Sequence, residues 1–194
     1  MKKTSFVLAL LPACLGLVAC AVSNTPNPVR YTLTPSAPTS TAAAPAVPFA
    51  RIAVPAYIDT PQIVTRNSEN TVVLNETRIW AEPLARAIQR AIPIQVAQKL
   101  CGKKIKNVEK VSVFIDRLDG TLDGKVLISA QIVVSRLTET EIKSESFLFS
   151  KNISAGTIDE VIYDMSEDPY ATYAQAISAA VAALAQAIAD NLCE

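Results

Sequence analysis

Hydrophobic and polar residues alternate through the middle of the chain, most clearly at 125–137. The apolar positions of that segment are Val126, Ile128, Ala130, Ile132 and Val134, and its polar positions include Lys125, Ser129, Gln131 and Ser135. A period of two with one apolar face is typical of an antiparallel strand whose other face meets solvent. Similar runs at 108–118 and 145–153 predict two more strands. The Asp-Gly pairs at 119–120 and 123–124 suit the connection between the first two.

Shorter β-branched runs predict four strands in the first half of the chain, at 29–33, 51–54, 62–66 and 71–74. Turn-forming residues at 67–70 lie between the last two and predict a hairpin. A stretch rich in Pro, Ala, Ser and Thr at 35–48 predicts an insertion without regular structure.

Two segments repeat apolar residues at helical spacing. In the first, 79–100, Trp80, Leu84 and Ile88 share one face, Pro83 suits the first turn, and Pro93 is expected to kink or split the helix. The second, 170–191, carries an apolar stripe that polar residues interrupt, which favours packing on a sheet over crossing a membrane. The sequence therefore predicts a single α+β domain over 29–194, an antiparallel sheet with two main helices packed on one face.

The first 20 residues predict a bacterial lipoprotein signal. Lys2 and Lys3 precede an apolar run that ends in Leu17-Val18-Ala19-Cys20, which matches the basic segment, apolar segment and lipobox of such signals. Residues 1–19 are expected to be removed. Cys20 is then expected to carry a diacylglyceryl group on its thiol and a fatty acyl chain, such as palmitate, on its new amine. Several acyl chains hold a protein to a membrane stably, whereas one holds it only marginally. An uncleaved anchor is disfavoured because about 14 apolar residues are too few to span a bilayer.

Residues 20–28 predict a lipidated tether. The eight residues after Cys20 reach at most about 26–29 Å when fully extended. Ala21 stands where an Asp commonly retains Gram-negative lipoproteins in the inner membrane. We therefore expect the protein to be anchored to the outer membrane, on its periplasmic face.

Composition limits the possible chemistry. The chain contains no histidine, which excludes Ser-His-Asp and Cys-His catalysis and the usual zinc sites. Basic and acidic residues number 18 each, so no nucleic-acid partner is indicated. Asp116, Asp119 and Asp123 suggest calcium, but their spacing differs from an EF-hand loop and a hairpin, which explains the same residues, is favoured. We expect no enzyme activity, metal or cofactor. In an oxidising periplasm, Cys101 and Cys193 are candidates for a disulfide.

Four segments carry a resemblance to a known family. They are Tyr31-Thr32-Leu33, Val54-Pro55-Ala56-Tyr57-Ile58-Asp59, Pro61-Gln62-Ile63-Val64-Thr65-Arg66 and Arg78-Ile79-Trp80-Ala81-Glu82-Pro83-Leu84. In this order they resemble the PqiC family, auxiliary lipoproteins of ABC-type and mammalian-cell-entry (MCE) transport systems. The insertion at 35–48 and Pro93 depart from the family pattern. The resemblance implies a non-enzymatic outer-membrane subunit that docks to a periplasm-spanning MCE-domain partner, supporting lipid transport and membrane integrity.

Contacts with that partner or within a homo-oligomer are predicted near the rigid loop between Pro55 and Pro61. The candidate residues are Tyr57, Ile58, Ile63 and Arg66. Tyr57 and Ile58 fit either a docking tip or a lid on the core. Arg66 is expected at the end of a short strand, solvated or paired near Arg78 or Glu76.

Two other functions remain open at this stage. One is a pilotin or assembly-plug lipoprotein of a different outer-membrane complex, built from the same helices and sheet. The other is a periplasmic hydrolase, which the missing histidine disfavours. Co-purification of MCE-domain proteins after mild crosslinking would separate the first function from the rivals.

Overall fold

A four-stranded sheet forms the centre of the computed structural model, which describes residues 27–34, 46–100, 103, 105, 107–154 and 168–193. Its strands are β2 (Phe49–Ala53), β5 (Val108–Gly120), β6 (Lys125–Leu137) and β7 (Ile142–Ser154), in the order β2-β5-β6-β7. β5, β6 and β7 pair antiparallel, as predicted, and β2 adds a parallel edge. The predicted apolar face of β6 is confirmed, because all five of its apolar residues are at most 2% exposed.

A β-bulge in β5 decides which face its polar residues occupy. Ile115 pairs with Ala130 and Leu118 with Ile128, so one extra residue, Asp116, is accommodated between them. Ile115 and Leu118 therefore both point to the core, and Asp119 falls on the opposite face of the sheet. Without the extra residue, strict alternation would turn Asp119 towards the apolar core.

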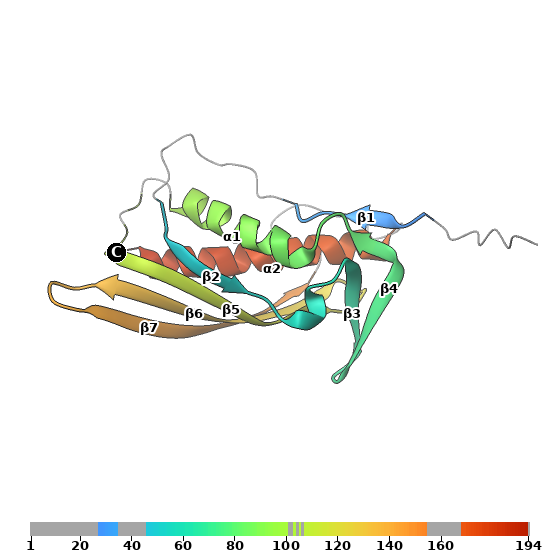
Figure 1. The fold of residues 1–194 in the computed structure, drawn as a ribbon. Helices are drawn as coiled ribbons and strands as arrows, with labels where there is room; N and C mark the ends of the chain where they lie inside the picture. The colour runs from blue at the N-terminus through green and yellow to red at the C-terminus, as the bar shows by residue number, and fades with distance from the viewer. Residues whose placement is uncertain are drawn as a thin grey trace, which may run out of the picture.

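A second sheet, absent from the prediction, lies at one end of the molecule (Figure 1). It contains β1 (Val29–Tyr31), β4 (Thr71–Trp80) and β3 (Gln62–Ser68) in the order β1-β4-β3, with β1 parallel to β4. The short 3-10 helix η1 (Ala56–Ile58) precedes β3. The predicted hairpin at 62–74 is present, and its second strand continues to Trp80.

The extension of β4 corrects the predicted start of the first helix. Asn75 interrupts the pairing with β3, and its side-chain oxygen accepts hydrogen bonds from the backbone N–H groups of Thr77 and Arg78, at 3.0 and 2.8 Å. The strand then resumes, and the Trp80 N–H donates to the Pro61 carbonyl at 2.7 Å. Trp80 therefore ends a strand, and it is 3% exposed.

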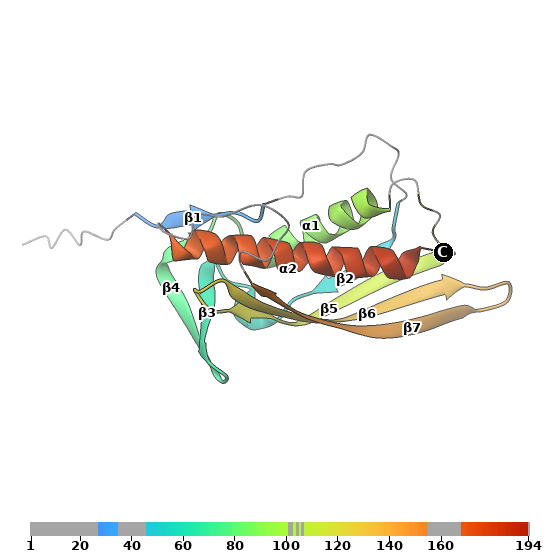
Figure 2. The ribbon, with the colours of Figure 1, turned by 180° about the vertical axis from the view of Figure 1, so that it is seen from behind.

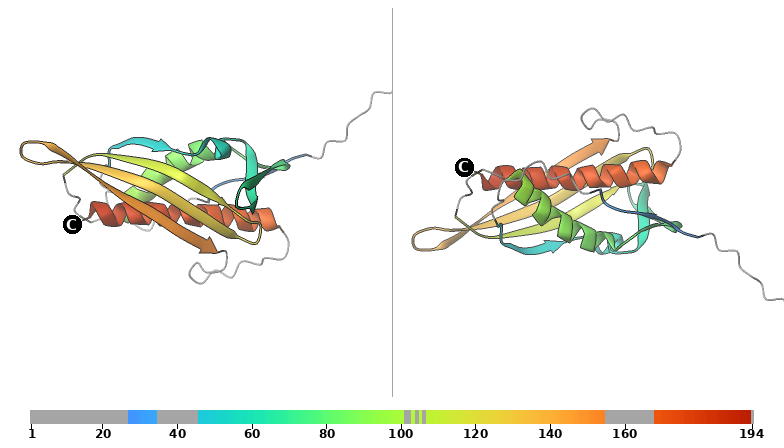
Figure 3. Two further views of the ribbon diagram at one scale, coloured as in Figure 1. Left: turned by 90° about the horizontal axis from the view of Figure 1, so that it is seen from below. Right: turned by 90° about the horizontal axis from the view of Figure 1, so that it is seen from above.

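Both helices lie on the same face of the four-stranded sheet (Figure 3). Helix α1 (Leu84–Lys99) begins after Pro83, and Pro93 lies inside it without splitting it. Pro93 removes one helical hydrogen bond, but the flanking residues Ile92 and Val96 are fully buried and hold the helix against its neighbours. The predicted α+β class is confirmed, with two mixed or antiparallel sheets in place of one.

Helix α2 (Pro169–Leu192) runs along the sheet against β5, β6 and β7, with α1 packed beside it (Figure 2). By length and composition it is the one helix of the described residues that could cross a membrane, but 61% of its apolar window is buried in the domain. The stripe Tyr173, Ile177, Val181, Leu184, Ile188 and Leu192 is 0–2% exposed. The helix is thus the central element of the core.

The predicted Cys101–Cys193 disulfide falls only partly within the described residues. Cys101 lies outside them, as do Cys20 and most of the 35–48 segment. Cys193 is half-buried and has no bonded partner among the described residues. Its backbone forms an isolated antiparallel bridge with Ile105, four positions after Cys101. The bridge brings the chain that follows Cys101 next to Cys193.

We predict that the disulfide forms in the periplasm. Cys101→Ser and Cys193→Ser should each lower the free energy of unfolding by about 2–4 kcal/mol, because a crosslink restricts the unfolded chain. The double variant should lose no more than either single one, since all three lack the same bond. Urea unfolding of oxidised protein measures this, with reduced wild type as the control. Additive losses, or two thiols that react with a maleimide in oxidised protein, would refute the pairing.

Candidate functional site

Asp119, near the end of β5, is a carboxylate removed from water. The bulge at Asp116 turns it to the sheet face that η1 and β3 cover, where its side chain is 0% exposed. Gly120 follows, and a Cβ there would lie 1.9 Å from the Lys125 carbonyl oxygen. Glycine thus permits the close approach of β5 and β6 beside the buried acid. A buried carboxylate is stable only when hydrogen-bonded and paired.

Two arginines supply that pairing. From β3, the Arg66 Nε and Nη2 donate to the two carboxylate oxygens of Asp119 at 2.6 and 2.7 Å. The Arg117 Nε adds a third hydrogen bond at 3.1 Å from the same strand as Asp119. A two-pronged guanidinium–carboxylate contact fixes orientation as well as charge. The pair therefore joins the two sheets in one defined arrangement.

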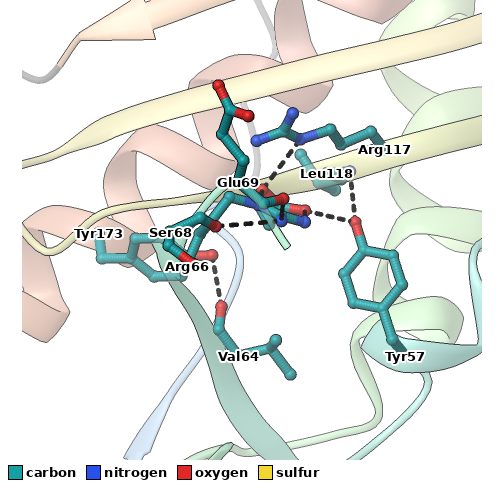
Figure 4. A network of polar contacts seen from close by, with 9 residues as sticks. Tyr57, Val64, Arg66, Ser68, Glu69, Arg117, Leu118 and Tyr173 are labelled. Carbon is teal, nitrogen blue, oxygen red and sulfur yellow. Dashed lines mark hydrogen bonds and ion pairs between the residues drawn. The ribbon is translucent and has the colours of Figure 1, made fainter. Parts of the chain in front are cut away.

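Tyr57 of η1 completes the Asp119 cluster, which we define as Tyr57, Arg66, Arg117 and Asp119 (Figure 4). The Tyr57 hydroxyl donates to Asp119 Oδ2 at 2.6 Å and accepts from the Leu118 N–H at 3.3 Å. Burial, with the adjacent carboxylate, raises the pKa of Tyr57 to about 12. Burial also raises the pKa of Asp119, but hydrogen bonds from Arg66, Tyr57 and Arg117 outweigh it and hold that pKa below its ordinary value.

The cluster also fixes the β3–β4 hairpin. The Arg66 Nη1 donates to the backbone carbonyls of Ser68 and Glu69 in the turn. On the other side of β3, the buried hydroxyl of Tyr173 donates to the Val64 carbonyl at 2.7 Å. The hairpin, which projects from the body of the molecule in Figure 1, is therefore held from the sheet and from α2.

A second polar group, the β1 cluster, joins the first strand to the start of α2. The Tyr31 hydroxyl donates to Asp168 Oδ2 at 2.7 Å and accepts from Arg78 Nη1 at 3.0 Å. Asp168 also accepts from the Tyr170 N–H at 3.0 Å, which caps the helix. The Arg78 guanidinium lies 5.4 Å from the centre of the Tyr170 ring, and Asn75 donates to the Tyr170 hydroxyl at 2.7 Å.

The structure brings together some of the predicted contact residues and buries others. Tyr57 and Arg66 meet at Asp119, a partner that the sequence did not identify for Arg66. Ile58 and Ile63 are 2% and 0% exposed, so their assignment to a contact surface is corrected. Their side chains belong to the core, and that of Ile58 lies beside Leu84 of α1 and Tyr173 of α2. For Ile58, the lid alternative fits this position.

The Asp119 cluster offers little chemistry beyond binding its own members. Both carboxylate oxygens accept hydrogen bonds from arginine, and Asp123 is engaged by Lys125 at 2.6 Å. Within the described part of the chain, no three His, Cys, Asp or Glu side chains are grouped to hold a metal ion. A pocket of about 320 Å³ opens beside the cluster, but the Arg66 and Arg117 groups on its wall already bind Asp119. The arrangement positions the hairpin and the loop before it.

The chain is similar to one protein family and to two solved structures. A family model described as "ABC-type transport auxiliary lipoprotein component" matches residues 31–189. A crystal structure described only as an uncharacterized protein has a TM-score of 0.59 at 16% identity, and the match covers 86% of this chain and 99% of that one. A Xanthomonas campestris protein assigned to DUF330 has a TM-score of 0.48 at 16% identity, covering 84% and 90%. No curated protein matches the chain.

We predict that Asp119→Ala destabilises the fold by about 3–5 kcal/mol, because it leaves the arginines and Tyr57 without their shared acceptor. Asp123→Ala, a matched control three residues from the bulged strand's end, removes an exposed ion pair and should change stability by less than about 1 kcal/mol. Urea unfolding at neutral pH measures both. Equal losses for the two variants would contradict the assigned role of Asp119.

The free energies of unfolding of wild type and Asp119→Ala should depend differently on pH. The folded-state pKa of Asp119 lies below its unfolded value, so its contribution is complete above about pH 4 and disappears as the pH falls through the lowered pKa. The stability difference between wild type and Asp119→Ala should therefore shrink from pH 6 to pH 2. A difference that stays constant over this range would show that ionisation of Asp119 contributes nothing.

Ile58→Asp should unfold or strongly destabilise the domain, by about 3 kcal/mol or more, because it buries an unpaired carboxylate. Val73→Asp is the control, since Val73 is 45% exposed on the nearby hairpin. Circular dichroism melting distinguishes them. A stable, soluble Ile58→Asp domain would restore the contact-surface interpretation of that residue.

Proposed function

Because the chain belongs to the family of ABC-type transport auxiliary lipoprotein components, we propose that it is a non-enzymatic outer-membrane subunit of an envelope lipid transport system. Membership agrees with the sequence resemblance to the PqiC family. In this proposal the subunit docks to a periplasm-spanning MCE-domain partner, assembles with further copies of itself and supports membrane integrity. The family match over most of the domain is the observation that carries the proposal.

The lipobox at 17–20 supports an anchored protein, and Ala21 supports sorting to the outer membrane. The tether after Cys20 leads directly into β1. β1 lies at the end of the molecule that carries the β3–β4 hairpin, away from the β6–β7 turn and the C-terminus (Figure 1). The eight-residue tether reaches at most about 26–29 Å, so the three-stranded sheet stays close to the bilayer.

The β3–β4 hairpin is the proposed contact with the transport partner. The family-like segments contribute Ile58, Val64, Trp80 and Leu84 to one packed point of the core. They build the base of the hairpin through Tyr57 and Arg66, and its far strand through Arg78 and Trp80. The hairpin presents Val73 and Leu74, which are 45% and 50% exposed. A rigid base and exposed apolar side chains are features of a docking element. Tyr57 and Arg66 then act by holding the hairpin, with Arg66 17% exposed.

The pilotin or assembly-plug alternative uses the same anchor and a similar domain. It differs in the partner, which would belong to another outer-membrane complex. A hydrolase remains the weaker alternative, because the charged residues of the Asp119 cluster are bound to one another.

Co-purification tests the proposal. We expect the lipidated chain, expressed with the ABC permease and MCE protein of its own system, to fractionate with the outer membrane and to retain the MCE protein after mild crosslinking. Leu74→Glu should reduce the retained MCE protein by about tenfold, since a charge in an apolar contact must be desolvated. Leu137→Glu is the control, because Leu137 is 52% exposed at the opposite turn.

Two results would overturn the proposal. Recovery of the wild type with the inner membrane would refute outer-membrane sorting. Capture of secretion or assembly proteins in place of the MCE protein would favour the pilotin alternative. An equal effect of Leu74→Glu and Leu137→Glu would leave the transport role but reject the hairpin as the contact.

A further inference from the structure

The two edge strands of the four-stranded sheet, β2 and β7, differ in whether their outward backbone groups are already hydrogen-bonded. At the β2 edge, Gln89 of α1 donates its side-chain N–H to the Ile52 carbonyl at 3.1 Å, so a backbone acceptor is already occupied. At the β7 edge, no second strand among the described residues pairs with β7 on the side away from β6. β7 is 13 residues long and carries Leu148, which is 81% exposed. A long open edge with an exposed leucine is a site for pairing with another strand.

The sequence of β7 is nearly symmetric about Leu148. Reading outwards, Phe147 and Phe149 flank it, then Ser146 and Ser150, and then Glu145 and Lys151, which carry opposite charges three positions away on either side. Two such strands paired antiparallel about a two-fold axis at Leu148 place Phe147 opposite Phe149 and Ser146 opposite Ser150. Glu145 of each copy meets Lys151 of the other. The strand is therefore complementary to itself in charge and in shape.

We propose that the β7 edge pairs with the β7 edge of a second copy of this chain, antiparallel and with Leu148 on the two-fold axis. This makes the self-assembly proposed above specific, and it does not depend on the transport partner. In this register, the numbers of two residues that face each other across the contact are equal or differ by an even number. The backbone groups that point outwards in one copy therefore meet those that point outwards in the other. An isologous two-fold contact requires this match.

The inner face of the sheet has space for the second copy. A groove of about 570 Å³ lies between β7 and α2, lined by Phe149, Ile153 and small residues that include Ala179, Ala183 and Ala187. In the proposed register, Phe147 of the second copy lies beside Phe149 and next to this groove. Alanine side chains leave room for the ring, which explains why an edge strand carries two half-buried phenylalanines.

The charged residues are accessible for the new contacts. Glu145 is 73% exposed, and its contact with the 18% exposed Arg136 side chain is long, at 3.8 Å. Lys151 is exposed. The pairing is also compatible with two lipid anchors. When β7 lies parallel to the membrane, the two-fold axis is normal to the membrane. β1 of both copies then faces the same bilayer.

Charge exchange tests the register. In sedimentation of the detergent-solubilised full chain, Glu145→Lys and Lys151→Glu should each weaken self-association roughly tenfold, because two like-charge contacts replace two opposite ones. The double variant Glu145→Lys with Lys151→Glu should recover wild-type association. Lys143→Glu is the matched control, since Lys143 lies on the same face but opposite Ile153 and should have little effect. Melting curves of all variants check that the fold is unchanged.

Disulfide crosslinking at Leu148 is a second test of the proposed register. Leu148→Cys should form a symmetric disulfide-linked dimer under mild oxidation, whereas Gln131→Cys, its neighbour on the same sheet face, should not. A monomeric wild type at high concentration, or no recovery in the double charge variant, overturns the proposal. Larger assemblies that survive both single charge variants also reject the β7 pairing, and retention of the MCE protein in the same samples would then leave the transport role standing.

Discussion

The burial of one carboxylate is the constraint on which the arrangement of the two sheets depends. Asp119 cannot remain charged in a dry site unless donors surround it. Its donors come from η1, β3 and β5: Tyr57 and Arg66 precede it by 62 and 53 residues, and Arg117 is its near neighbour on β5. Each of these elements is therefore in place only when the others are. The bulge at Asp116 is part of the same solution, because it directs Asp119 away from the helices and towards the arginines.

Tyrosine hydroxyls repeat this principle around the three-stranded sheet. Tyr57, Tyr173 and Tyr31 each carry a large apolar ring into the interior and end in a hydroxyl that finds a partner. A phenol combines packing with one directed hydrogen bond. The three therefore tie short strands, which have few ladder hydrogen bonds of their own, to the main sheet and to α2. This explains how a three-residue strand such as β1 keeps a defined position.

The sequence predicts the parts of the fold whose pattern is local. The alternation in β6 and the stripe of α2 extend over enough residues to define both the element and its buried face. Trp80 misled the prediction because it stands four residues before Leu84, a helical spacing, while the Asn75 interruption that prolongs β4 leaves no periodic signal. The parallel pairings of β1 and β2 are equally hidden, since nothing within a strand records its neighbour. Arg66 and Asp119 are 53 residues apart, and only the folded chain shows that they meet. Asp119 directly before Gly120 suggested a turn, and nothing in the sequence indicated the bulge at Asp116 that buries Asp119.

The position of β1 has a mechanical consequence. In the proposed lipid-anchored protein the tether precedes this strand, so a pull on the anchor would act first on three residues in the smaller sheet. The strand resists through its pairing with β4 and through the Tyr31–Asp168 contact at the cap of α2. Separation of β1 from β4 would lengthen the tether by several residues and leave the main core folded. In the proposed anchored protein, β1 would therefore be the first element of the domain to detach under such a pull.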